Sequence, residues 1–156
     1  MLGGLAVAGV ILVSQLAAPG SADGQLGAAF VDDYMRLAVR EDHIVTSDSA
    51  EVRRFLMREL GTMVAPLSAP GFIIEGAEVC LLRGRRGAMI RYRTDAGPVS
   101  YYMVPGASVR GRLPTINTTS SNGTTLVTWV SGHTERALVG PLPAADLLAI
   151  ARHETE

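Results

Sequence analysis

The chain has 156 residues, 47% of them hydrophobic, and its 14 basic and 15 acidic side chains give a formal net charge of −1. This length suits one domain with an added anchor, and the balanced charge argues against a polyanion such as nucleic acid as the partner. The single cysteine, Cys80, excludes an intrachain disulfide and a zinc site built on paired cysteines.

The N-terminal segment, residues 2–18, is apolar apart from Ser14 and Gln15 and carries no charged side chain. A membrane span needs roughly 17–25 such residues. We therefore predict a transmembrane helix or signal anchor within residues 1–22, with residues 2–18 in contact with membrane lipid. Two alternatives remain open. One is a signal peptide cut after Ala22, although no basic residue precedes the apolar run; the other is a buried core helix.

Two amphipathic helices are predicted next, in an α+β domain that we place at residues 23–156. The first covers residues 26–41, where apolar side chains recur on one side at helical spacing. The second begins after Asp48, whose side chain can cap the helix while Glu51 completes a capping box. Gly61, which tolerates a left-handed backbone, is expected just after its end. The apolar face of the second helix comprises Val52, Phe55, Leu56 and Leu60.

Three arginines, Arg53, Arg54 and Arg58, fall on the opposite side of the second helix. Such a group can bind an anionic ligand or lipid, or it can form an ordinary solvated helix face. Glu51 and Glu59 are interleaved with these arginines, which favours the solvated face.

Short apolar segments separated by glycine-containing turns follow, which is typical of an antiparallel meander. Strands are predicted at residues 71–75, 77–83, 87–93, 98–104, 124–130 and 134–139. We therefore expect a five- or six-stranded antiparallel sheet. Met89 and Arg91 alternate with Ile90 and Tyr92, so we expect one polar face and one buried face. Residues 110–122 are predicted to form a polar loop at the edge of the sheet.

The C-terminal part of the chain predicts a hairpin covered by a closing helix. Trp129, the only tryptophan, lies in a segment rich in β-branched residues, and Gly132 suits the turn that follows. Pro143 fits the first turn of a helix. Leu147 and Ala151 then fall on one apolar stripe, which we expect to pack over Trp129.

Two blocks of residues carry a family resemblance. The first comprises His43, Val52, Phe55, Leu56, Leu60, Gly61, Leu67, Ser68, Gly71, Gly76, Ala88 and Tyr92. The second comprises Trp129, Gly132, Leu142, Pro143, Leu147, Leu148 and Ala151. Together, over residues 42–151, they resemble the extracytoplasmic region of bacterial transmembrane anti-sigma factors, the predicted transmembrane transcriptional regulator family. Phe55 stands where the family usually has a tryptophan.

The resemblance implies a single-pass protein of the bacterial cytoplasmic membrane with its C-terminal domain outside the cytoplasm. It also implies a sensor or interaction domain that acts by protein binding in transcription regulation. Family members carry a cytoplasmic sigma-binding domain ahead of the membrane helix, often with an H-x-x-x-C-x-x-C zinc motif, and the present sequence lacks that motif. A sigma factor is therefore expected as the partner only where an upstream cytoplasmic domain exists.

Two other functional classes stay open. The chain could be an accessory or structural subunit that its N-terminal helix tethers to a larger membrane protein complex. It could also be a secreted module that binds a small ligand. Co-purification with an abundant membrane complex would favour the first of these classes.

Residues that could carry chemistry are few and scattered. His43, His133 and His153 are far apart and stand at no metal-ligand spacing. Cys80 lies in an apolar segment, which favours a small buried hydrophobic residue over a reactive thiol. The Gly-Arg-Arg-Gly run at 84–87 resembles a phosphate nest in composition, but a hairpin turn explains it better. We therefore expect no catalytic residue, no metal site and no cofactor, in a protein that is not an enzyme.

The first prediction concerns the N-terminal segment. If residues 2–18 span the bilayer, the chain should stay in the membrane fraction after carbonate washing, because an uncharged apolar helix partitions into lipid. A shortened protein that starts at Asp23 and appears in the supernatant would show a cleaved signal peptide instead.

Overall fold

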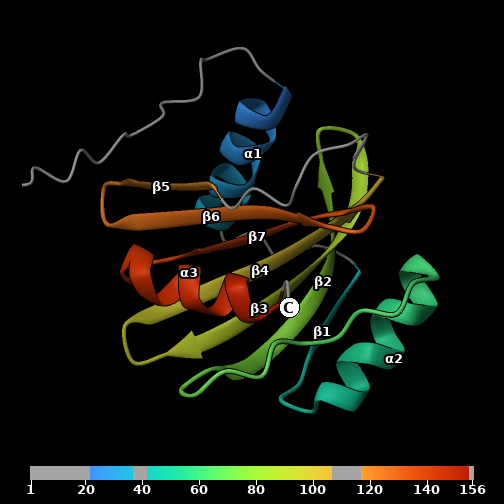
Figure 1. The fold of residues 1–156 in the computed structure, drawn as a ribbon. Coiled ribbons are helices and arrows are strands. Elements are labelled where there is room, and N and C mark those ends of the chain that lie inside the picture. Colours follow the sequence, from blue (N-terminus) through green and yellow to red (C-terminus); the bar gives the residue numbers. More distant parts are fainter. Residues whose placement is uncertain (1–21, 37–41, 107–116, 155–156) are drawn as a thin grey trace, which may run out of the picture.

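The structure, a computed structural model, describes residues 22–36, 42–106 and 117–154, which form three helices and one seven-stranded antiparallel sheet (Figure 1). The helices are α1 (Ala22–Arg36), α2 (Ser49–Leu60) and α3 (Ala144–His153). The strands are β1 (His43–Val45), β2 (Ile73–Leu82), β3 (Arg85–Thr94), β4 (Gly97–Pro105), β5 (Asn117–Ser121), β6 (Thr124–Ser131) and β7 (Thr134–Gly140). Their order across the sheet is β1-β2-β3-β4-β7-β6-β5. The predicted α+β class is confirmed.

The sheet has seven strands where five or six were predicted, because neither β1 nor β5 was expected. The segment that forms β5 has no alternation of apolar and polar side chains, so it was assigned to the polar loop at residues 110–122. That assignment is wrong for residues 117–121, which pair with β6. Asn122 and Gly123 make the tight turn between the two strands with positive φ angles of 51° and 75°. Residues 107–116 lie outside the described part of the chain.

One strand, β2, replaces the two short strands predicted on either side of Gly76. Its pairing with β3 shifts register between Ile74 and Gly76, as in a β-bulge. A Cβ atom at Gly76 would collide with the main-chain carbonyl oxygen of Ile44 on β1. Glycine therefore marks the close approach of a neighbouring strand at this position and does not end the strand.

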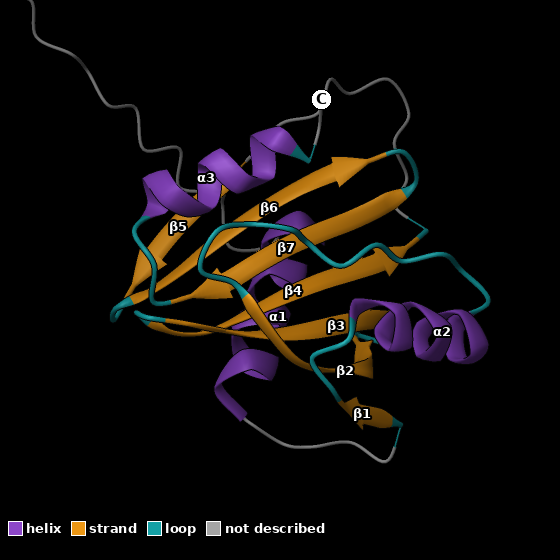
Figure 2. Cartoon of the chain, turned by 90° about the horizontal axis from the view of Figure 1, so that it is seen from below, coloured by secondary structure: helices purple, strands orange, loops and turns teal. Residues whose placement is uncertain are grey.

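Helices cover both faces of the sheet (Figure 2). On one face, α2, α3 and the connector at residues 61–72 bury the larger apolar cluster. On the other face, Leu26 and Phe30 of α1 pack in a second cluster that includes Met89 and Tyr102. The expectation of one polar face is therefore wrong at the centre of the sheet. The alternation of side chains was read correctly, but only the tertiary structure shows that α1 covers the second face.

The ends of α2 follow the predicted pattern. Asp48 caps the helix, and its carboxylate accepts a hydrogen bond from the main-chain N–H of Ala50 at 2.7 Å. The reciprocal arm of the capping box runs through Thr46, whose hydroxyl donates to the carboxylate of Glu51. Gly61 follows the last turn in a left-handed conformation with φ of 67°.

The helix predicted at residues 26–41 is α1, which begins earlier, at Ala22, and is described as far as Arg36. Residues 37–41 lie outside the described part. None of the described helices combines the length and the apolar character that a membrane crossing requires. The span predicted at residues 2–18 also lies outside the described residues, so it stays a prediction.

Trp129 anchors the larger cluster, as the sequence predicted. Its side chain is 1% exposed and stacks on Tyr101, with ring centroids 6.1 Å apart and an angle of 13° between the planes. The closing helix α3 lies over β6 and β5, and its Leu147 and Ala151 are fully buried. A stacked aromatic pair of this kind adds stabilisation beyond that of the area it buries.

Replacing Trp129 by alanine should lower the free energy of unfolding by about 3–5 kcal/mol, because truncating a buried aromatic residue leaves a cavity. Denaturant unfolding followed by circular dichroism measures the change without a tryptophan signal. Val130→Ala, at the half-buried neighbouring position, is the control and should cost clearly less. A midpoint for Trp129→Ala close to that of the unaltered protein would contradict the assigned burial.

Candidate functional site

The residues that the sequence offered for chemistry are not brought together. His43 on β1, His133 in the turn between β6 and β7, and His153 at the end of α3 are all exposed and lie on three different elements. Cys80 is fully buried against the α1 face, which agrees with a structural role. No group of three or more metal-ligating side chains exists among residues 22–36, 42–106 and 117–154.

Large apolar side chains are exposed at several places instead, among them Met35 on α1, Val45 on β1 and Ile73 at the start of β2. Met57, Met63 and Leu81, which we call the methionine patch, are 45%, 71% and 53% exposed. Met57 is in the last turns of α2, Met63 follows two residues after Gly61, and Leu81 is near the end of β2. Exposed large apolar groups that gather in one region mark interaction surfaces more often than single exposed residues do.

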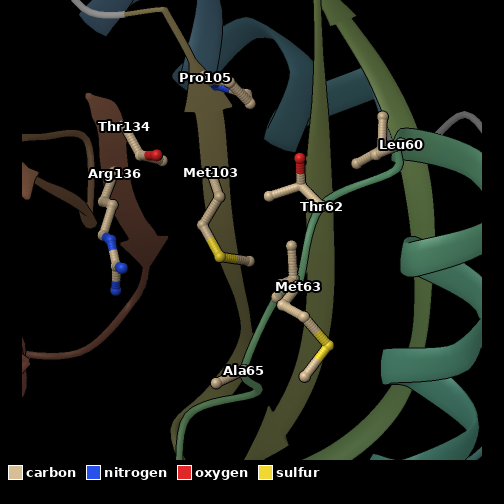
Figure 3. A pocket seen from close by; sticks show the side chains of 9 residues that line it. Leu60, Thr62, Met63, Ala65, Met103, Pro105, Thr134 and Arg136 are labelled. Carbon is tan, nitrogen blue, oxygen red and sulfur yellow. The ribbon is translucent and has the colours of Figure 1, made fainter. Parts of the chain in front are cut away.

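A small crevice adjoins the methionine patch (Figure 3). It is lined by Leu60 of α2, residues 62–65 of the connector, Met103 and Pro105 of β4, and Thr134 and Arg136 of β7. Figure 3 shows Met103 between Arg136 on one side and Met63 on the other. The cavity volume is about 70 Å³. This is less than half of the roughly 150 Å³ that holds a benzene molecule, so the crevice suits one aliphatic side chain.

Arg136 forms the charged wall of the crevice. Its Nη1 donates to the hydroxyl of Tyr101 at 2.8 Å and to a carboxylate oxygen of Glu154 at 3.3 Å, which ties β7 to the end of α3. The Nε of Arg136 and the indole Nε1 of Trp129 are buried without an acceptor among the described residues. Trp129 and Arg136 are cross-strand partners on β6 and β7. Two N–H donors without an acceptor among the described residues therefore come from neighbouring positions of the sheet.

A second hollow lies at the β1 edge, on the face that α1 covers. It is lined by His43, Val45, Glu75, Glu78, Met89 and Arg91 and has a volume of about 90 Å³. Glu78 is 3% exposed and lies 3.7 Å from the guanidinium of Arg91. The ionisable residues in its lining are Glu75, Glu78, Arg91 and His43, so the lining includes groups of both signs. Both hollows are well below the several hundred Å³ of ordinary small-molecule pockets.

The two edges of the sheet differ. One edge strand, β1, has three residues, whereas the other, β5, has five, and its described side chains are exposed hydroxyls from Thr118 to Ser121. Within the part of the chain that the structure describes, neither strand pairs on its outer side. An unpaired outer edge can accept a strand from a partner.

Sequence reasoning did not find the methionine patch. Met57 falls outside the apolar stripe of α2, among the arginines assigned to the solvated face, and Arg53, Arg54 and Arg58 are indeed exposed. Leu81 lies in the strand predicted at residues 77–83, and the pattern does not show which apolar side chains of that strand stay exposed. The only available indication was that Met57 and Met63 flank the end of a helix otherwise polar on that side.

Comparisons with known proteins add no assignment. No family model and no curated protein matches this chain. One solved structure, a GTP-binding regulator from Thermotoga maritima, is similar with 16% sequence identity and a TM-score of 0.41, over 53% of this chain and 76% of that one. A likeness at this level carries no conclusion about fold or function. The resemblance to anti-sigma factors is not tested by these comparisons and stays a prediction.

Burial raises the pKa values of the core tyrosines on both faces of the sheet. It raises the pKa of Tyr101 to about 12, although the neighbouring guanidinium of Arg136 acts in the opposite direction. Burial also raises the pKa values of Tyr92 and Tyr102. A raised pKa in the folded state means that the folded protein holds the phenol proton more strongly than the unfolded chain does.

The free energy of unfolding should therefore be constant below the unfolded pKa of tyrosine, about 10, and should fall as the pH rises from there through 12. Ultraviolet absorbance of tyrosinate should develop together with loss of the circular dichroism signal. Tyr101→Phe should make the fall with pH less steep. Complete ionisation of all four tyrosines near pH 10 in a protein that keeps its fold would contradict this.

Proposed function

We propose that this chain is a binding module: a membrane-anchored extracytoplasmic sensor or interaction domain that acts by protein binding. The observation that carries the proposal is the methionine patch, where three large apolar side chains stay exposed beside a crevice of side-chain size. Methionine is flexible and polarisable, so it suits surfaces that adapt to a partner. Among the described residues, no group of three or more histidine, cysteine, aspartate or glutamate side chains could hold a metal ion.

The scaffold under the patch supports recognition because it is fixed. The connector that carries Met63 is held down by the buried side chains of Val64 and Leu67. The main-chain N–H of Leu67 donates to the buried hydroxyl of Tyr92 at 2.7 Å. A surface that is already ordered loses less conformational entropy when it binds.

The proposed location in the cytoplasmic membrane rests on the sequence resemblance alone. It supports a single-pass protein of the cytoplasmic membrane whose C-terminal domain, from residue 23 onward, belongs to a regulator similar to the outer part of an anti-sigma factor. The alternative is an accessory or structural subunit tethered to a larger membrane complex, and the same exposed patch would serve it. An upstream reading frame that encodes a zinc-binding sigma-factor domain would favour the first of these.

A second surface is the polar segment at residues 110–122, of which β5 forms the described part. Its exposed edge could add a strand from a partner. Replacing residues 110–116 by a glycine–serine segment of the same length should leave the fold intact, because the chain can still pass from β4 to β5 across two intervening strands. It should change the set of bound proteins if this surface takes part, and identical partners from both proteins would remove the segment from the proposal.

The proposal is tested in native membranes with the full chain. A photoreactive amino acid at position 63 should crosslink to a protein, and the same group at position 35 should not, since Met35 is 64% exposed on α1, which covers the other face. Crosslinks of equal yield from both positions, or none from position 63, would contradict binding at the patch. A metal-dependent hydrolytic activity of the purified chain would contradict the binding-module assignment itself.

A further inference from the structure

We infer that the methionine patch binds an acidic and apolar segment of a partner protein, with an aliphatic side chain in the crevice and carboxylates on the arginines beside it. This inference rests on the proposed function, because it names the chemistry of the partner at that same surface. It draws on three features of the described residues: the placement of arginines without an ion pair, the bonds that the nearby acids already make, and the concave shape of the site.

Arginine side chains flank the patch from both sides. Arg86 is the cross-strand partner of Leu81, so the two side chains project from the same face of the sheet as close neighbours. Arg54 precedes Met57 by three residues on α2, which places the two side chains next to each other on the helix surface. Both arginines are exposed, and neither makes an ion pair with a described residue.

The acidic residues of this region are already engaged. Glu59 binds its neighbour Arg58 at 2.8 Å, and Glu154 binds Arg136 at 3.3 Å. Glu51, three residues before Arg54, accepts a hydrogen bond from the hydroxyl of Thr46. On the sheet side the border of the patch therefore carries the positive charge of Arg86, which no ion pair with a described residue offsets, whereas on α2 Glu51 stands one turn before Arg54. The complementary partner is acidic, since an opposite charge at the rim speeds and orients association.

The shape of the site favours a protein segment over a lipid bilayer. A bilayer surface is entered by protruding apolar side chains, whereas the crevice beside Met63 recedes between β4, β7 and the connector. Thr62 and Thr134 place hydroxyl groups at its rim, which can bond to the main chain of an extended or helical peptide. An aliphatic side chain with acidic neighbours matches the crevice together with the arginines beside Met57 and Leu81.

The test uses the full chain in detergent and a fluorescein-labelled peptide of alternating glutamate and leucine. Peptides of lysine and leucine, and of glutamate and serine, have the wrong charge and no apolar group respectively. Fluorescence anisotropy should give an affinity for the glutamate–leucine peptide that is at least about tenfold above both others. Added salt should weaken it, since the charged contacts are exposed.

The variants separate the charge from the apolar contact. Arg54→Glu with Arg86→Glu should lower the affinity about tenfold or more, and so should Leu81→Ser with Met63→Ser. The matched controls, Arg36→Glu and Met35→Ser, make the same chemical changes at exposed positions of α1 on the opposite side of the sheet and should change nothing. Unchanged circular dichroism and unfolding midpoints show that each variant is folded.

Three results would overturn the inference. They are equal binding of the glutamate and lysine peptides, no binding of the glutamate–leucine peptide, and full affinity in the Arg54→Glu, Arg86→Glu protein. Sedimentation with phosphatidylglycerol vesicles that is lost in the same variant, without peptide binding, would assign the patch to a lipid surface. If position 63 crosslinks to a protein in membranes but the acidic peptide does not bind, the partner chemistry is wrong while the proposed function stands.

Discussion

Burial of both faces of β4 is the constraint on which the rest of this structure depends. Every side chain from Val99 to Val104 is buried, so the strand needs an apolar cover on each side. One cover is α1, which places Phe30 against the ring of Tyr102 with centroids 5.1 Å apart. The other is made of three parts, α2, the connector and α3, because no single described element spans the whole of that face.

The divided cover explains where the candidate site lies. The connector must cross the sheet to start β2 at the far end, and its buried Val64 and Leu67 fill the space between α2 and α3. At the start of that crossing, next to Gly61, the cover is thin. Met63 is left exposed there, and the crevice opens between the connector, β4 and β7. A gap between packed elements on a rigid sheet is a common origin of binding surfaces.

The charge around this gap depends on which arginine side chains are bonded to other elements of the fold and which are not. Arg85 is drawn to the carbonyl oxygen of Pro105 at 2.8 Å and to Glu135, and Arg136 is drawn to Tyr101 and Glu154, so both hold strands and helices together. Arg86, next in sequence to Arg85, projects from the opposite face, and its side chain makes no ion pair with another described residue. A chain with a net charge of −1 thus exposes the positive charge of Arg86 beside Leu81.

The sequence by itself determined the elements whose causes are local. The caps of α2 at Asp48 and Gly61, the hairpin turn at Gly132 and the apolar stripe of α3 depend on neighbours a few residues away, and each was predicted where it occurs. The tertiary structure alone decided what depends on distant partners. Pairing with β6 turns the polar residues 117–121 into a strand, and α1 buries Met89 on a face that alternation had marked as polar. The candidate site belongs to this second group, because Met57, Met63 and Leu81 become a surface only when α2, the connector and β2 reach the same end of the sheet and nothing in the described chain covers them.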